Sequence, residues 1–142
     1  MNTLNNYFDH VFCINLVNRP DRRNKMQERF NKLGIIVEWI TTVEFGFADK
    51  LLYLLKKAGH DFVNPGEISC AIAHYSIIKI AKERGYKNIF ILEDDCVFHK
   101  DFNELLPECM SLLAPLKWDM LFLYTMQFHD KINKLVVNDT SS

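Results

Sequence analysis

Apolar runs of strand length alternate along the chain with longer stretches of helical periodicity. The runs Val11–Leu16 and Ile35–Val43 are rich in β-branched and aromatic residues, which predicts two strands. Between them, Pro20–Leu33 repeats apolar residues at helical spacing and is followed by Gly34, a typical helix stop. The first third of the chain is therefore expected to form a strand, a helix and a second strand.

The same alternation continues through the rest of the chain. The remaining expected elements are helices over 47–58, 65–84 and 101–113 and strands over 88–92 and 118–124. Strands that alternate with helices indicate a three-layer α/β sandwich with a mostly parallel sheet. Because the strand over 88–92 is apolar on both faces, we expect it to be central.

Composition and charge narrow the class of protein. The chain has 142 residues, 49% of them hydrophobic and 25% charged, which fits one globular domain. Its net charge of −1 gives no electrostatic case for binding nucleic acid or an anionic membrane. The N-terminus does not resemble a signal peptide, no apolar stretch approaches the roughly 20 residues of a transmembrane segment, and no C-x-x-C pair occurs. We expect a cytoplasmic protein in a reducing compartment.

Three consecutive carboxylates, Glu93, Asp94 and Asp95, follow directly on the strand expected over 88–92. In open α/β sheets, ligands bind outside the carboxyl ends of the strands. Clustered carboxylates repel one another unless a cation compensates them, and their oxygens suit Mg²⁺ or Mn²⁺ shared with a phosphorylated ligand. Alternation along an extended segment would place Glu93 and Asp95 on one face. A solvated acidic loop is the simpler alternative.

A second candidate ligand loop, Asn18–Arg23, lies between the first strand and the helix that follows it. It carries Arg19, Arg22 and Arg23 where positive charge is unfavourable to the helix dipole. A helix N-terminus with guanidinium groups nearby is an anion site, so a diphosphate would fit between this loop and the acidic triplet. The alternative is that the arginines are solvated surface charges, paired in part with Asp21.

One expected helix contains eleven consecutive residues without a formal charge, Ile68–Ile78, and should be buried nearly all round. His74 stands in the middle of this run, either as a hydrogen-bonded core histidine or as a functional one. Cys13, Cys70 and Cys96 lie in apolar runs and are interpreted as small hydrophobes.

Three of these stretches together resemble glycosyltransferase family 25, which includes lipooligosaccharide and procollagen galactosyltransferases. They are an I-N-L loop with R-x-D-R, a helix with G-E-I-x-C-x-x-x-H, and a strand that ends in L-E-D-D, and they occur in this order between Val11 and Tyr124. The resemblance implies a GT-A-like, Rossmann-like fold and a UDP-sugar donor, with galactose or glucose as the hexose. It also implies Mn²⁺ or Mg²⁺ as cofactor and inverting transfer to a lipooligosaccharide or other glycan acceptor.

The resemblance also implies roles for individual residues. Glu93 and Asp95 would hold the metal, with Asp95 as the more direct ligand. Inverting transfer needs a general base, for which Asp119 is the candidate, unless it only begins a strand. The residues placed around the donor are Asn15, Arg19, Asp21 and Arg22 in the loop, Gly66, Glu67 and His74 in the helix, and Asp94.

The chain departs from the family in its length, and residues 125–142 form an atypical C-terminal tail where family members continue. We therefore expect a single domain, 1–142, that corresponds to the donor-binding half of a short or C-terminally truncated member. One alternative is a fold-intact but inactive fragment. Another is a receiver-type phosphoacceptor domain, although Asn18 and Arg19 stand where such a domain needs acids. Peripheral membrane association and a homodimer stay open.

Overall fold

The computed structural model describes residues 2–41, 50, 53–59 and 65–122. The residues up to Leu112 and those from Leu113 onward form two units, and each is described by itself. All of the described strands belong to the first unit, and so do the described helices except for Leu113, the last residue of the last helix. The predicted tail over 125–142 lies outside the described residues.

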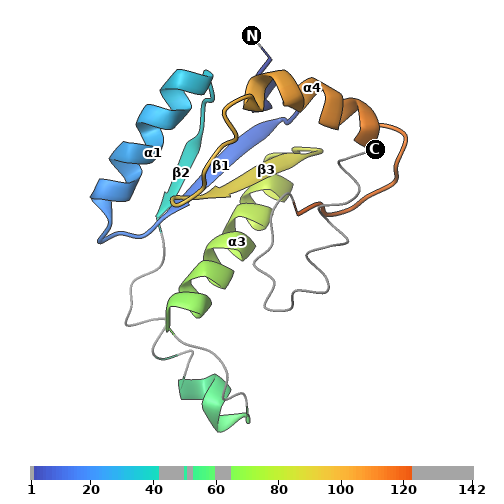
Figure 1. Cartoon of the computed structure of the whole chain (residues 1–142). Coiled ribbons are helices and arrows are strands. Elements are labelled where there is room, and N and C mark those ends of the chain that lie inside the picture. The colour runs from blue at the N-terminus through green and yellow to red at the C-terminus, as the bar shows by residue number, and fades with distance from the viewer. Residues whose placement is uncertain (1, 42–49, 51–52, 60–64, 123–142) are drawn as a thin grey trace, which may run out of the picture. The chain divides into compact units, whose positions relative to one another are not determined.

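Three parallel strands form the sheet of the first unit, as far as it is described (Figure 1). Their order is β2-β1-β3, with β1 at His10–Asn15, β2 at Glu38–Thr41 and β3 at Ile89–Glu93. Among the described strands, β3 therefore lies at an edge and not at the centre as expected, and β1 is central. The burial agrees with this order, because the side chains from Val11 to Asn15 are all buried, whereas most of β3 is only partly buried.

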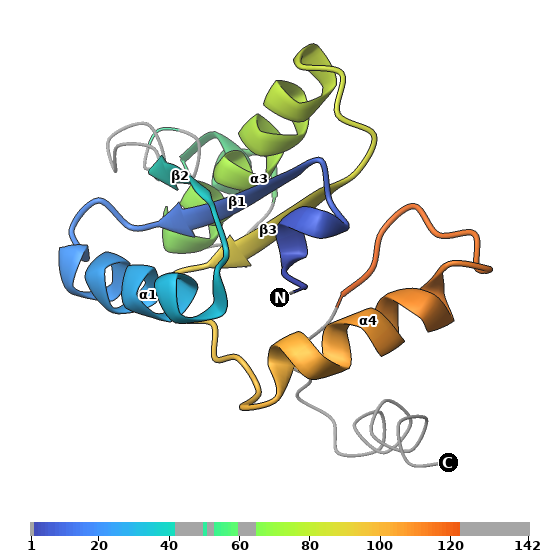
Figure 2. The same ribbon diagram turned by 90° about the horizontal axis from the view of Figure 1, so that it is seen from above.

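Helices cover both faces of this sheet. The helical elements are the 3₁₀ helix η1 (Leu4–Asn6) and the α-helices α1 (Pro20–Leu33), α3 (Pro65–Glu83) and α4 (Phe102–Leu113), and residues 53–57 are also helical. Figure 2 shows α1 and α4 on one side of the sheet and α3 on the other. Among the described residues, no helix is both long and apolar enough to cross a bilayer.

Alternate side chains of β1 enter two different hydrophobic clusters, which explains the layering. The cluster on the side of α1 and α4 includes Val11, Cys13, Met26, Phe30, Leu92 and Leu106. The cluster on the side of α3 includes Phe12, Ile14, Ala73 and Ile77. The predicted three-layer α/β sandwich with a parallel sheet is thus confirmed, consistent with a Rossmann-like GT-A fold.

Helix α3 is less buried than its uncharged sequence predicts. Ile68, Ala73 and Ile77 are buried, but Tyr75 is 68% exposed and Ile78 is 50% exposed. The described strands offer α3 one sheet face, so only one side of the helix packs. The expectation of burial nearly all round is therefore wrong for the structure as described.

The fourth strand predicted over 118–124 is not present in its described part. Residues 118–122 have no strand assignment, and Met120 and Phe122 are 65% and 68% exposed. An apolar run forms a strand only where a neighbouring edge takes up its backbone hydrogen bonds, and the segment has no such ladder. Residues 123–124 lie outside the described part.

Gly34 ends α1 in the left-handed conformation, with φ of 66°, as the sequence predicts. Its N–H donates to the carbonyl groups of Phe30 and Asn31. We expect Gly34→Ala to lower the free energy of unfolding by about 1 kcal/mol, because a β-carbon is strained at positive φ. Urea unfolding would measure the loss. Lys32→Ala, an exposed change in the same turn, is the control, and an equal loss in both variants would contradict the cap argument.

Candidate functional site

The loops that follow β1 and β3 meet at one edge of the sheet. The two strands are parallel neighbours, and Ile14 of β1 is paired with Glu93, the last residue of β3. The chain leaves β1 at Asn15 and enters α1 at Pro20. The loop Asn18–Arg23, called the arginine loop from here on, and the acidic triplet Glu93–Asp95 are far apart in sequence. They are therefore brought together as predicted.

Asp94 joins these two loops through its buried carboxylate. Its Oδ2 accepts hydrogen bonds from Asn15 Nδ2 at 2.7 Å and from the Leu16 N–H at 3.3 Å. Its Oδ1 lies 3.3 Å from a guanidinium nitrogen of Arg22. Asn15 Nδ2 also lies 3.2 Å from the Arg19 carbonyl oxygen. Both oxygens of Asp94 thus have protein partners, and the residue holds the loops in register.

Arg22 lies between two of the three carboxylates. The nitrogen that contacts Asp94 is also 3.6 Å from Asp95 Oδ2, and the Asp95 side chain is 60% exposed. The chain turns here, because the Cys96 N–H donates to the Glu93 carbonyl, so the alternation of an extended strand ends at Glu93. Asp94 and Asp95 therefore share Arg22, and Glu93 contacts Cys70 of α3. The charge of Asp95 also acts on Cys70, so the expected grouping of Glu93 with Asp95 stays a prediction.

The other two arginines of the loop also have partners. Arg19 forms a two-pronged ion pair with Asp21, at 2.9 and 2.7 Å, which confirms the pairing considered for Asp21. The hydrogen bond from Arg19 lowers the pKa of the Asp21 carboxyl to about 2. The guanidinium of Arg23 lies 5.0 Å from the ring centre of Trp39, a cation–π distance. Arg22 is thus the arginine of this loop that contacts the acidic triplet directly.

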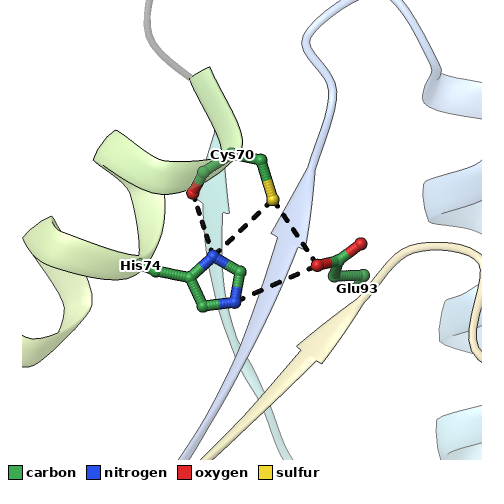
Figure 3. Close-up of side chains that lie close together, drawn as sticks. All are labelled: Cys70, His74 and Glu93. Carbon is green, nitrogen blue, oxygen red and sulfur yellow. Dashed lines mark hydrogen bonds and ion pairs between the residues drawn. The ribbon is translucent and has the colours of Figure 1, made fainter. Parts of the chain in front are cut away.

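Glu93 belongs to a second group of side chains, with Cys70 and His74 of α3 (Figure 3). Glu93 Oε1 lies 3.5 Å from Cys70 Sγ and 4.0 Å from His74 Nε2. His74 Nδ1 lies 2.9 Å from the Cys70 carbonyl oxygen. The His74 side chain is hydrogen-bonded as in the alternative of a core histidine, but at 37% exposed it is half-buried and does not lie in the core.

Cys70 is the site residue that the sequence reading missed. Burial raises the pKa of its thiol to about 11, and the charge of Glu93 adds to this effect. The signal was present in the sequence, because Cys70 and His74 are four residues apart and so share one helix face. That they face Glu93 was not visible, because it depends on the packing of α3 against β3.

Three further predicted site residues are exposed. Gly66 and Glu67 lie in the first turn of α3, and Asp119 lies in the second unit. Since residues 118–122 form no strand, the alternative that Asp119 merely begins one is wrong. The roles of these residues toward a donor or acceptor stay predictions.

The chemistry of the acidic triplet fits a hard divalent cation. Magnesium-type ions are held by one or two carboxylates and complete their shell with water and phosphate oxygens. Glu93 and Asp95, with side chains 52% and 60% exposed, can supply such oxygens. Asp94 cannot do so without giving up its contacts to Asn15 and Leu16.

Comparison with known proteins relates this chain to one family. The profile described as Glycosyltransferase family 25 (LPS biosynthesis protein) matches residues 8–139. A Glycosyltransferase 25 family member of Aedes aegypti is 29% identical over 90% of this chain and 23% of its own length. Procollagen galactosyltransferase 1-B of Xenopus laevis is 33% identical over 82% of this chain and 21% of its own.

Relatives that are described as inactive have a similar sequence identity to this chain. A protein of Mus musculus described as Inactive glycosyltransferase 25 family member 3 is 29% identical over 82% of this chain and 22% of its own length. The chain thus spans less than a quarter of the length of these curated relatives.

The match of the family profile over residues 8–139 also excludes the alternative of a receiver-type phosphoacceptor domain. On this evidence the chain belongs to glycosyltransferase family 25.

Proposed function

We propose that this chain binds a UDP-sugar at the carboxyl ends of β1 and β3 and serves the transfer of its hexose, galactose or glucose, to a glycan acceptor. The observation that carries the proposal is the joining of the arginine loop to the acidic triplet through Asp94. Parallel α/β sheets bind their ligands at this edge. Family membership makes a sugar nucleotide the ligand class of choice.

The residues at this edge suit a leaving diphosphate. Arg22 carries positive charge beside the exposed Asp95, and the first N–H groups of α1 follow directly on the loop. A divalent cation, when bound through Asp95, supplies the charge that stabilises the departing UDP. The hydrogen bond between Asp94 and Asn15 holds the two loops together, which positions the proposed phosphate-binding groups before the ligand arrives.

Turnover is the test of the proposed transfer. The purified chain is given UDP-galactose or UDP-glucose, Mn²⁺ and acceptors that carry galactose, glucose or heptose, and UDP release is compared with product mass. The proposal predicts acceptor-dependent UDP release with a product heavier by one hexose. Donor binding without any product would instead favour a binding-only member, the alternative suggested by the relatives described as inactive.

Arg22→Ala should weaken UDP binding. The charge-assisted contact that it removes is worth about 1.5–3 kcal/mol, which corresponds to a roughly 10- to 150-fold increase in Kd. Arg23→Ala is the matched control, because Arg23 is on the same helix turn but packs over Trp39. Calorimetric titration with UDP distinguishes the two. Unchanged affinity in Arg22→Ala would assign Arg22 to holding Asp94 alone.

A further inference from the structure

We propose that Cys70, His74 and Glu93 form a binding site for a borderline-soft divalent cation of the Zn²⁺ class, separate from the donor-associated cation assigned to Asp95. The three residues each offer one ligand atom, and these atoms all lie within 4.8 Å of one another. Cys70 and His74 come from one face of α3, and Glu93 ends β3 (Figure 3). The site thus joins two elements of the fold through their side chains.

The distances are close to those a bound ion requires. With zinc–sulfur bonds of about 2.3 Å and zinc–nitrogen or zinc–oxygen bonds of about 2.0–2.2 Å, tetrahedral ligand atoms lie about 3.4–3.6 Å apart. Glu93 Oε1 lies 3.5 Å from Cys70 Sγ and 4.0 Å from His74 Nε2. All three ligand atoms lie within 4.8 Å of one another, so the side chains must still move toward one another to close the set around an ion.

The tautomer of His74 also suits a ligand. Its Nδ1 lies 2.9 Å from the Cys70 carbonyl oxygen, which can only accept a hydrogen bond. Nδ1 therefore donates to that carbonyl, which leaves Nε2, 4.0 Å from Glu93 Oε1, as the ring nitrogen that can bind an ion. Metal-bound histidines in proteins typically donate their second ring N–H to a carbonyl or carboxylate in this way.

The mixed set of donors selects the ion. Thiolate and imidazole favour Zn²⁺ and related metals, whereas Mg²⁺ and Mn²⁺ favour the carboxylate oxygens offered by Asp95. Binding replaces the S–H bond of Cys70 with a sulfur–metal bond and releases one proton to solvent. Three protein ligands leave a fourth tetrahedral position for water or another ligand.

A nucleophilic Cys–His pair is the competing interpretation of this cluster. Such a pair needs the imidazole to take the thiol proton, but His74 Nδ1, the nitrogen 3.6 Å from Cys70 Sγ, is occupied by the Cys70 carbonyl. Metal binding does not need His74 to accept the thiol proton, because the cation itself displaces that proton to solvent.

Cobalt substitution tests the site, because a Co²⁺–thiolate bond absorbs light that a Co²⁺–carboxylate bond does not. The reduced, intact chain is titrated with Co²⁺, and Zn²⁺ is then added as competitor. We expect a thiolate-to-cobalt charge-transfer band that saturates at one ion per chain and is displaced by Zn²⁺. Absence of the band in the wild-type chain would overturn the proposal.

Variants decide which residues bind. Cys70→Ser should remove the band, and His74→Ala should weaken Co²⁺ binding by more than the roughly 10- to 100-fold typical of losing an outer-shell partner. Cys109→Ser, a change at an exposed cysteine of α4, should leave the band unchanged. Circular dichroism checks that each variant is folded. A band that survives Cys70→Ser, or disappears in Cys109→Ser, would contradict the assignment.

Asp95→Asn separates this site from the proposed donor site. The variant should keep the cobalt band while losing the Mn²⁺-dependent part of UDP affinity. A wild-type chain that shows the band but does not bind UDP would refute the donor site alone. A chain that binds UDP with Mn²⁺ but shows no band would refute the Cys70–His74–Glu93 site alone.

Discussion

Asp94→Ala is expected to lower the free energy of unfolding by about 2–4 kcal/mol. The carboxylate is buried, and its loss leaves Asn15 Nδ2 and the Leu16 N–H without the acceptor that they have in the fold. An unsatisfied buried polar group costs about 1–3 kcal/mol, and Arg22 also loses a partner. Because the Arg22 side chain is 34% exposed, water compensates part of that last loss.

Urea unfolding of neighbouring variants measures this effect. Asp95→Ala is the matched control, because that side chain is 60% exposed and its removal should change stability by no more than about 0.5 kcal/mol. Asp94→Asn keeps one acceptor oxygen and should fall between the two. Equal midpoints for Asp94→Ala and Asp95→Ala would show that the buried carboxylate does not hold the loops together.

Asp95→Asn is expected to remove the Mn²⁺-dependent part of UDP affinity while the fold stays intact. Asparagine keeps the size of the side chain but loses the charge that binds a hard cation. For the Asp95→Asn variant, the Kd for UDP measured with Mn²⁺ should equal the Kd of the same variant measured with EDTA. Calorimetry gives both numbers on one preparation.

The control for Asp95→Asn is a charge change of the same kind far from the sheet edge. Glu83→Gln removes an exposed carboxylate at the C-terminal end of α3, whose ion pair is with Lys79. UDP affinity should not change in that variant. If wild-type affinity is the same with Mn²⁺ and with EDTA, Asp95 has no metal to lose and its assigned role is wrong.

The sequence predicted the layers of this fold well because the relevant signals are local. The helix over Pro20–Leu33 was predicted with its observed bounds, since Pro20 suits a first turn and Gly34 supplies the left-handed stop. The strand at Ile89–Glu93 was located to within one residue because its apolar run of strand length is also a local signal. Its place at the side of β1 was not predicted, because strand order depends on which residues pack together across the whole chain.

The candidate site was predicted in its parts but not in its contacts. The sequence indicated that Arg22 and the acidic triplet would meet, because strand ends of a parallel sheet share an edge. It did not indicate that Asp94 would be buried and bonded to Asn15, 79 residues away. Nor did it show that Glu93 would contact Cys70, because that contact depends on how α3 packs beside the strand end.

The absence of the predicted strand over the described residues 118–122 has a different cause. The run is apolar enough for a buried strand, yet Phe122 is 68% exposed in the described part. Strand propensity reports how well a side chain fits a pleated, half-buried surface, and says nothing about whether a partner edge is available. Segments of this kind are where pattern-based prediction of strands is weakest.

Paramagnetic relaxation by Mn²⁺ tests most directly whether the sheet edge at the ends of β1 and β3 is a diphosphate site. Backbone amide signals are recorded with substoichiometric Mn²⁺, with and without UDP, and Mg²⁺ serves as the diamagnetic reference. We predict UDP-dependent broadening centred on Leu16, Asp94 and Cys96. The amides of His10 and Ile89, which are paired at the opposite ends of these strands, should stay sharp. Broadening that does not depend on UDP, or that centres on His10 and Ile89, would contradict the account.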